Sequence, residues 1–243
     1  MKLNYIHQLD CLEGLKLVDA NSVNLIIADP PYLIDTLDSD SNSNRMIKMN
    51  RESYLEWSDN WIKECSRVLK NTGSMYLFGG NIIHALFPIM EKYLVFKNSI
   101  SWIKKNRVVT TPQLRNWFPK CEIILFFTKN EKGYTWNQIV KEYGLMESSN
   151  YQMIANISPR MKEGVAHPSQ KPLELIEKFV KASSNENDIV LDPFMGSGTT
   201  AVASKKLNRQ FLGFDVDKGY VELANKRLEK TCVRIKTDIK DWF

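Results

Sequence analysis

The chain has 243 residues, of which 43% are hydrophobic and 25% charged, a composition that indicates a folded globular protein and excludes extended disorder. Its net charge is +5. Because its four cysteines lie far apart without a CxxC pair, we expect no metal site, no disulfide framework and a reducing, cytoplasmic compartment. The N-terminal residues lack the apolar core of a secretory signal, and no apolar run is long enough to span a bilayer, so we expect no membrane association.

Short apolar runs alternate with helical patterns along the chain. Most of the apolar runs lack polar alternation, as strands buried on both faces do. Strands are expected at residues 24–29, 74–79, 99–104, 122–128, 188–194 and 210–216. Helices are expected at residues 54–69, 81–93, 172–184, 199–207 and 219–231. This alternation predicts an α/β fold, namely a doubly wound, mostly parallel Rossmann-like sheet with helices on both faces.

Two segments and two prolines qualify this pattern. Residues 35–53 are polar and rich in Ser and Asn, so we expect a loop that covers a site, whereas residues 130–166 lack clear periodicity. Pro88 is expected to kink or end the second helix, and Pro172 to occupy the first helical position of the third.

The first buried strand ends in Asp29-Pro30-Pro31-Tyr32. The two prolines fix their φ angles and offer no N–H group, which makes the turn rigid. A purely structural role for the turn explains the prolines. A catalytic role also explains why a carboxylate precedes the prolines and an aromatic ring follows them.

Positive charge is concentrated between Lys97 and Lys132, a segment that contains eight basic residues and only two acidic ones. Such a patch is the expected footprint of a polyanion, although a solvated surface gives the same pattern. The candidate phosphate contacts are Lys104, Lys105, Arg107, Arg115 and Lys120.

A glycine-rich turn joins the strand at 188–194 to the helix at 199–207. Gly196 and Gly198 allow close approach of a ligand, and the following helix N-terminus favours an anionic group. Asp215 lies 23 residues after Asp192, where an acid commonly binds ribose hydroxyls. A carboxylate at Asp192 would repel a pyrophosphate, which disfavours a dinucleotide. A nucleoside such as S-adenosylmethionine fits better, because its cationic end suits Asp192 and its carboxylate suits the helix terminus.

Together, Asp29–Tyr32 (DPPY), Asp192–Thr199 (DPFMGSGT) and His167–Pro172 (HPSQKP) resemble the motifs of the β-class DNA amino-methyltransferases, which modify adenine N6 or cytosine N4. The resemblance implies the methyltransferase version of the predicted sheet, S-adenosylmethionine as cofactor and double-stranded DNA as partner. It implies that the methionine carboxylate lies near Lys171, the ribose near Asp215 and the adenine near Asp10 and Cys11. It also implies supporting roles for His167 and Ser169. The residues implied to cradle the cofactor are Asp192, Phe194, Gly196, Ser197, Gly198 and Thr199.

The resemblance assigns the catalytic role to Asp29, Pro30, Pro31 and Tyr32. The Asp29 carboxylate and the Pro30 carbonyl can accept the two protons of an exocyclic amine, which directs the nitrogen lone pair toward the methyl group. Tyr32 can stack on a base that has been rotated out of the duplex. DPPY favours adenine N6 as the target, and cytosine N4 stays open as an alternative.

We interpret residues 1–243 as one catalytic domain with a catalytic half at 20–129 and a cofactor half at 167–231. The insertion at 130–166 is the expected target-recognition region, with Arg160 and Lys162 as candidate readers of DNA. By analogy with similar enzymes, a homodimer and a cognate restriction enzyme are further expected partners.

Other classes of protein remain as alternatives. A non-catalytic DNA-binding partner of another methyltransferase need not keep both motifs. An enzyme acting on RNA or on a protein glutamine amide is a second alternative, although the protein-amide enzymes carry NPPY after the cofactor motif. A nucleotide-dependent oxidoreductase leaves Asp29–Tyr32 unexplained.

Overall fold

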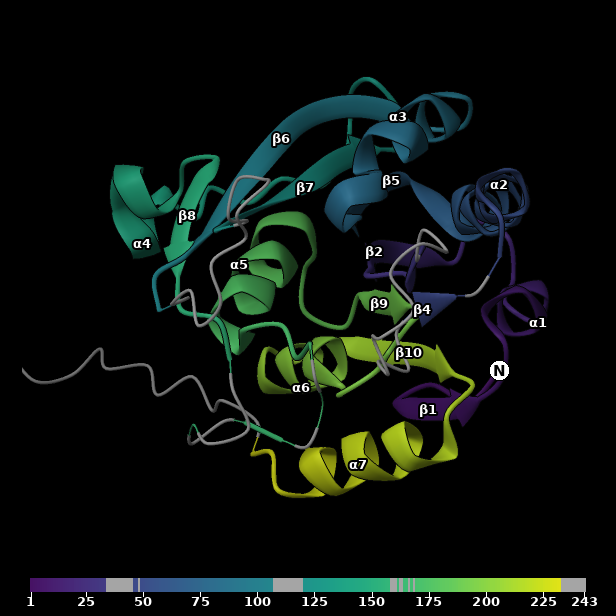
Figure 1. Cartoon of the computed structure of the whole chain (residues 1–243). Helices are drawn as coiled ribbons and strands as arrows, with labels where there is room; N and C mark the ends of the chain where they lie inside the picture. Colours follow the sequence, from purple (N-terminus) through teal and green to yellow (C-terminus); the bar gives the residue numbers. More distant parts are fainter. Residues whose placement is uncertain are drawn as a thin grey trace, which may run out of the picture.

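A computed structural model gives the arrangement of the chain, and the described residues are 1–33, 46–47, 49–106, 120–157, 161, 164–165, 167 and 169–232. Within them lies an eight-stranded sheet in the order β1-β10-β9-β2-β5-β7-β6-β8 (Figure 1). All neighbouring pairs are parallel except those of β7, which runs antiparallel to β5 and β6. In sheet order the strands are β1 Tyr5–Gln8, β10 Gln210–Asp215, β9 Ile189–Asp192, β2 Val23–Ala28, β5 Leu69–Phe78, β7 Cys121–Thr128, β6 Val95–Lys104 and β8 Tyr151–Ile154. A separate parallel pair joins β3 (Tyr32–Leu33) to β4 (Met46–Ile47).

Helices cover both faces of the sheet (Figure 1). On β2, Ile26 and Ala28 point into the core beneath one set of helices, while Leu25 and Ile27 point into the core beneath the other. This two-sided burial explains why the β2 sequence is apolar without alternation. The first set is α1 Cys11–Lys16, α2 Arg51–Val68 and α3 Ile83–Glu91, the last preceded by a short 3-10 turn at Gly80–Ile82. The opposite set is α5 Leu173–Ser183, α6 Thr199–Lys206 and α7 Lys218–Glu229.

Local sequence determines where several helices begin. The Asn50 side chain accepts a hydrogen bond from the Ser53 amide and caps α2, so this helix begins before the predicted residue 54. Pro172 is the N-cap of α5 and has an extended conformation. The prediction that it is the first helical residue was therefore wrong by one position. Pro88 lies inside α3, which continues to Glu91.

The segment at 130–166, which has no periodicity in the sequence, contains regular structure in its described part. Residues Val140–Glu147 form α4, which Gly144 interrupts with a φ of 78°, and β8 adds a short strand to the edge of the sheet. The predicted lid at 35–53 lies mostly outside the described residues. Its described part contributes β4 and the first residues of α2.

Strands β2 and β9 lie side by side at the centre of the sheet, with Leu25 opposite Val190 and Ile26 opposite Leu191 (Figure 1). From β9 the chain passes through α6 to β10 on one side, and from β2 it passes through α2 to β5 on the other. The connections therefore diverge above the carboxyl ends of these two strands, which is where open α/β sheets bind ligands. Asp192 ends β9 and Asp29 follows β2, so both acids lie at this crevice.

Within the described ranges, we find no helix with the length and apolar character needed to traverse a bilayer.

Candidate active site

A cavity of about 380 Å³ opens at the crevice between β2 and β9. Its size is in the range of small-molecule sites. Eight of the residues singled out in the sequence line it, and they come from both halves of the chain: Asp10, Cys11, Asp29, Pro31, His167, Phe194, Gly196 and Asp215. The sequence therefore predicted much of this wall, including residues as far apart in the chain as Asp10 and Asp215.

Other lining residues were missed in the sequence. Trp57 projects from α2 toward Phe194, with ring centroids 5.8 Å apart, and Tyr220 of α7 packs on the His167 ring at 4.5 Å. Leu9, Met49, Pro193, Val216 and Asp217 complete the part of the wall that was not singled out. The cavity thus combines an apolar aromatic wall with carboxylates such as Asp29 and Asp215. This lining fits S-adenosylmethionine, which carries an adenine ring, ribose hydroxyls and a cationic sulfur.

Asp215 organises the glycine turn. Its Oδ2 accepts a hydrogen bond from the Gly196 amide at 2.8 Å, and its Oδ1 accepts one from the Asp217 amide at 2.9 Å. The same carboxylate lines the cavity. Asp215 thus fixes the shape of the turn, and its contact with ribose stays a prediction.

Gly198 and Thr199 lie behind the cavity wall. Gly198 has a φ of 77°, and a Cβ there would lie 2.7 Å from the Cβ of Ala224 in α7. The Thr199 hydroxyl accepts a hydrogen bond from Arg227 at 2.9 Å, and Arg227 also donates to the Ser197 carbonyl. These residues join α6 to α7, so their cofactor role is at most indirect in the geometry observed.

Asp192 also turns into the protein. Its oxygens accept hydrogen bonds from the Phe194 amide at 2.9 Å and the Thr200 hydroxyl at 2.6 Å. Burial raises the pKa of this carboxyl to about 7, and the two hydrogen bonds offset part of that shift. Asp192 borders a narrow void of about 20 Å³ and does not line the larger cavity, so its contact with the cationic end of the cofactor stays a prediction.

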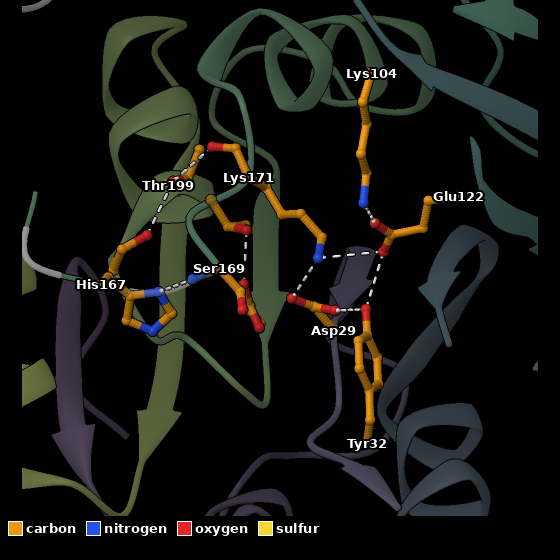
Figure 2. Close-up of polar contacts among 11 residues, drawn as sticks. Asp29, Tyr32, Lys104, Glu122, His167, Ser169, Lys171 and Thr199 are labelled. Atoms are coloured by element: carbon orange, nitrogen blue, oxygen red, sulfur yellow. Dashed lines mark hydrogen bonds and ion pairs between the residues drawn. The ribbon is translucent and has the colours of Figure 1, made fainter. Parts of the chain in front are cut away.

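Asp10 and the HPSQKP turn show the same local anchoring. Asp10 caps α1 by accepting a hydrogen bond from the Leu12 amide at 2.8 Å. The ring nitrogen Nδ1 of His167 accepts a hydrogen bond from the Ser169 amide at 3.4 Å, which supports the predicted structural role of that turn (Figure 2). Cys11 is buried beside the cavity, and burial raises the pKa of its thiol far above the ordinary value.

Five side chains form a charge cluster at the catalytic motif, which we call the Asp29 cluster: Asp29, Tyr32, Lys104, Glu122 and Lys171 (Figure 2). The Lys171 ammonium lies 2.9 Å from Asp29 Oδ2 and 3.3 Å from Glu122 Oε1. Lys104 lies 2.7 Å from Glu122 Oε2. The Tyr32 hydroxyl lies 3.0 Å from Asp29 Oδ1 and 2.9 Å from Glu122 Oε1. The four charged side chains are only 8–12% exposed.

The Asp29 cluster changes two expectations. Lys171 was expected at the cofactor carboxylate, yet its ammonium contacts Asp29 and Glu122, so a contact with the cofactor stays a prediction. Lys104 was expected at a DNA phosphate, yet it is an almost buried partner of Glu122, which speaks against that contact. Pro30 is buried next to Asp29, and Tyr32 is partly buried.

Glu122 is the functional candidate that the sequence analysis missed. Burial would raise the pKa of its carboxyl, but Lys171 and Lys104 outweigh burial and hold the pKa below its ordinary value. The signal was present, because an acid inside an otherwise apolar strand is rarely buried unless it is paired.

The remaining DNA-binding candidates are of two kinds. Lys105 and Lys120 are exposed, as a phosphate contact requires, and they stay predictions. Arg107, Arg115, Arg160 and Lys162 lie outside the described residues. Among the residues that the structure does describe, no group of three or more His, Cys, Asp or Glu side chains is placed to hold a metal ion.

Comparison with known proteins identifies the family. The DNA methylase family, of the N6/N4 type, matches residues 23–226. The type II methyltransferase M.HpaI of Haemophilus parainfluenzae is 36% identical over 234 residues, which cover 90% of this chain and 72% of the relative. The DNA adenine methyltransferase YhdJ of Escherichia coli strain K12 is 32% identical over 244 residues, which cover 90% of this chain and 81% of the relative.

A solved structure agrees with the sequence relatives. The crystal structure of M1.HpyAVI in complex with SAM shares 30% identity and a TM-score of 0.68, covering 92% of this chain and 98% of that chain. This likeness confirms the predicted Rossmann-like methyltransferase sheet. The chain therefore belongs to the DNA methylase family of the N6/N4 type and is an S-adenosylmethionine-dependent DNA methyltransferase.

Proposed function

We propose that the protein methylates the exocyclic N6 of adenine at specific sites in duplex DNA. The position of Asp29 carries this proposal. Its carboxylate, 8% exposed, follows β2 and borders the same cavity as Phe194 and Gly196 of the glycine turn. A group that can accept an amine proton and a turn that can hold the methyl donor thus share one wall.

The target nitrogen is a poor nucleophile, because its lone pair is delocalised into the purine ring. Asp29 accepts one N–H and the Pro30 carbonyl accepts the other, so the nitrogen becomes more tetrahedral and its lone pair turns toward the cavity. S-adenosylmethionine supplies an electrophilic methyl group when it is bound there. A fixed carboxylate stabilises the positive charge that develops on the amine, and alignment of the two reactants lowers the barrier further.

Several residues would hold the cofactor. Asp215 would take the ribose hydroxyls, and Asp10 and Cys11 would lie beside the adenine, while Phe194 and Trp57 line the apolar wall. Lys171, with His167 and Ser169 supporting its turn, would have to leave Asp29 and Glu122 to meet the methionine carboxylate.

Two observations favour adenine over cytosine as the target. The motif at Asp29–Tyr32 begins with Asp, which is typical of enzymes that act on adenine N6. The relative YhdJ is named a DNA adenine methyltransferase. Because the amine is buried in a duplex, the adenine rotates out of the stack, and Tyr32 offsets roughly 1–3 kcal/mol of that cost by stacking.

DNA binds over the same edge of the sheet. The exposed Lys105 and Lys120, with Arg107 and Arg115, contact phosphates, so affinity falls steeply as salt rises. The insertion at 130–166, including Arg160 and Lys162, reads the target sequence within a single catalytic domain.

The test is direct. The full chain is incubated with radiolabelled S-adenosylmethionine and duplex DNA, the DNA is digested to nucleosides, and the labelled nucleoside is identified by chromatography. N6-methyladenine is the expected product. N4-methylcytosine would redirect the assignment to the exocyclic amine of cytosine. If no nucleoside carried label, the proposed activity would be contradicted, and a non-catalytic DNA-binding partner would explain the result.

A further inference from the structure

The Tyr32 hydroxyl lies between two carboxylates of the Asp29 cluster, 3.0 Å from Asp29 Oδ1 and 2.9 Å from Glu122 Oε1 (Figure 2). A phenol has a single proton, so it donates fully to only one carboxylate at a time. The other contact between two oxygens is favourable when the proton is shared or when the second carboxylate is itself protonated. These three groups therefore form a path along which a proton can move from Asp29 to Glu122.

The surroundings stabilise either end of this path. Lys171, which precedes the N-cap residue of α5, contacts both carboxylates, and Lys104 of β6 contacts the second oxygen of Glu122. Two ammonium groups thus balance two carboxylates in a setting that is 8–12% exposed, where charges interact strongly. The methyl-transfer step described above uses Asp29 and Tyr32 but assigns nothing to Glu122.

We propose that Glu122, acting through Tyr32, takes up the proton that the target amine releases during methyl transfer. The inference rests on the proposed function, since it needs an exocyclic amine beside Asp29. Glu122 is a positioning residue and proton acceptor that does not touch the substrate itself.

The amine nitrogen bonds the methyl carbon, and the electron pair of the broken carbon–sulfur bond stays on sulfur. The nitrogen then keeps the electron pair of one N–H bond, and that proton moves to Asp29. Asp29 passes a proton to the Tyr32 oxygen while the Tyr32 proton moves to Glu122 Oε1. Asp29 is ionised again, and Glu122 loses its proton to bulk water before the next turnover.

The direction of transfer follows from the chemistry of the groups. A methylated adenine amine that still carries its extra proton is a strong acid, because losing the proton restores conjugation with the ring. Lys171 and Lys104 keep Glu122 ionised beforehand, so it is ready to accept. The same two ammonium groups, 2.7 Å and 3.3 Å from its oxygens, favour return of Glu122 to the ionised form afterwards.

A purely structural role for Glu122, as counter-ion to two lysines, makes a different prediction. Glu122→Gln keeps the size of the side chain and an oxygen that can accept from Tyr32, but it cannot take a proton. Tyr32→Phe keeps the ring but removes the bridge. The matched control is Glu177→Gln in α5, because Glu177 is 6% exposed and its carboxylate lies 2.5 Å from the Lys206 ammonium, away from the cavity.

The experiment measures single-turnover methyl transfer to duplex DNA by the full chain, from about pH 6 to about pH 9, for the wild type and these three variants. Binding of S-adenosylmethionine is measured by titration. We expect Glu122→Gln and Tyr32→Phe to slow transfer by about tenfold or more at the acidic end, with cofactor affinity unchanged. We expect the deficit of Glu122→Gln to shrink as pH rises, because solvent bases replace the lost carboxylate. Glu177→Gln should match the wild type.

Four results would overturn the inference. Transfer by Glu122→Gln that matches the wild type throughout would show that no proton reaches Glu122. A deficit of constant size at every pH, or an equal deficit in Glu177→Gln, would assign Glu122 to structure alone. A wild-type protein that methylates no DNA overturns the proposed function and this inference together, whereas an active wild type with an unimpaired Glu122→Gln overturns only the inference.

Discussion

Lys171 and Asp29 form a buried ion pair, with 2.9 Å between the ammonium nitrogen and Oδ2 and side chains 10% and 8% exposed. Asp29 follows β2, and Lys171 lies just before Pro172, the N-cap of α5. The pair therefore ties the proposed amine-binding carboxylate to the turn that is expected to hold the methyl donor. Removal of this pair should lower both the free energy of unfolding and the rate of methyl transfer.

Lys171→Met is expected to lower the free energy of unfolding by about 3–5 kcal/mol, because it leaves Asp29 as a buried charge with less compensation. Urea unfolding, followed by circular dichroism, measures the change. Lys92→Met is the control, since Lys92 pairs with Asp59 at 3.0 Å but is 53% exposed, and exposed pairs contribute roughly 0–1 kcal/mol. Equal losses in the two variants would show that the Lys171 pair is no stronger than a surface pair.

Asp29→Ala should abolish methyl transfer and leave cofactor binding intact. Removal of one fixed group that stabilises transition-state charge typically costs about 10²–10³ in rate. Tritiated-methyl incorporation measures the rate, and titration with S-adenosylmethionine measures affinity. Asp29→Asn keeps one oxygen acceptor and should fall between the wild type and Asp29→Ala. Retained activity in Asp29→Ala would remove Asp29 from the catalytic role.

Gly198→Ala should destabilise the protein through the packing of α6 on α7. The left-handed φ costs about 1–2 kcal/mol for a residue with a Cβ, and the contact with Ala224 adds roughly 1–3 kcal/mol. Gly133→Ala is the matched control, because Gly133 has a φ of 76° and open space around the added Cβ. Thermal and urea unfolding of both variants separate the two contributions. If the two variants lost the same stability, Gly198 would owe its role to backbone conformation alone.

Asp192→Asn should change how stability depends on pH. Burial raises the pKa of Asp192 from its ordinary 3.8 to about 7 in the folded protein. Between these values the folded state holds the proton more tightly than the unfolded state, so this group's contribution to stability is present at low pH and is lost as pH rises, by roughly 4 kcal/mol. Asn has no such titration and keeps an oxygen for the Phe194 amide.

The stability of Asp192→Asn relative to the wild type should therefore grow as pH rises from about 4 to about 7. Urea unfolding at several pH values measures the difference, and Asp19→Asn is the control for loss of an exposed carboxylate. A difference that stays constant across this range would contradict the raised pKa.

The sequence predicted those parts of the fold that depend on local pattern. The uninterrupted apolar run at β2 identified a strand buried on both faces, and the strand, Gly turn and helix from β9 to α6 had the expected form. The four-residue strand β1 and the interrupted helix α4 were missed, since neither is long enough to show a period.

The site was predictable as a set of residues but not in its orientations. The motifs brought Asp29, Phe194 and Asp215 to one cavity, as expected. Nothing in the sequence shows that Tyr32 contacts Glu122, since ninety positions separate them. Nor does it show that Asp192 turns inward, because that depends on the hydroxyl of Thr200, eight positions along the chain in the first turn of α6.

The central strands β2 and β9 meet although 165 positions of chain separate Asn24 from Ile189, whose amide donates to the Asn24 side chain. Each strand enters the sheet through its own helix, so neither relies on the other's connection. We therefore expect the cavity to form whichever of the two strands comes first along the chain. A circularly permuted chain, or two separate fragments that reassociate along this seam, would rebuild the same wall around Asp29.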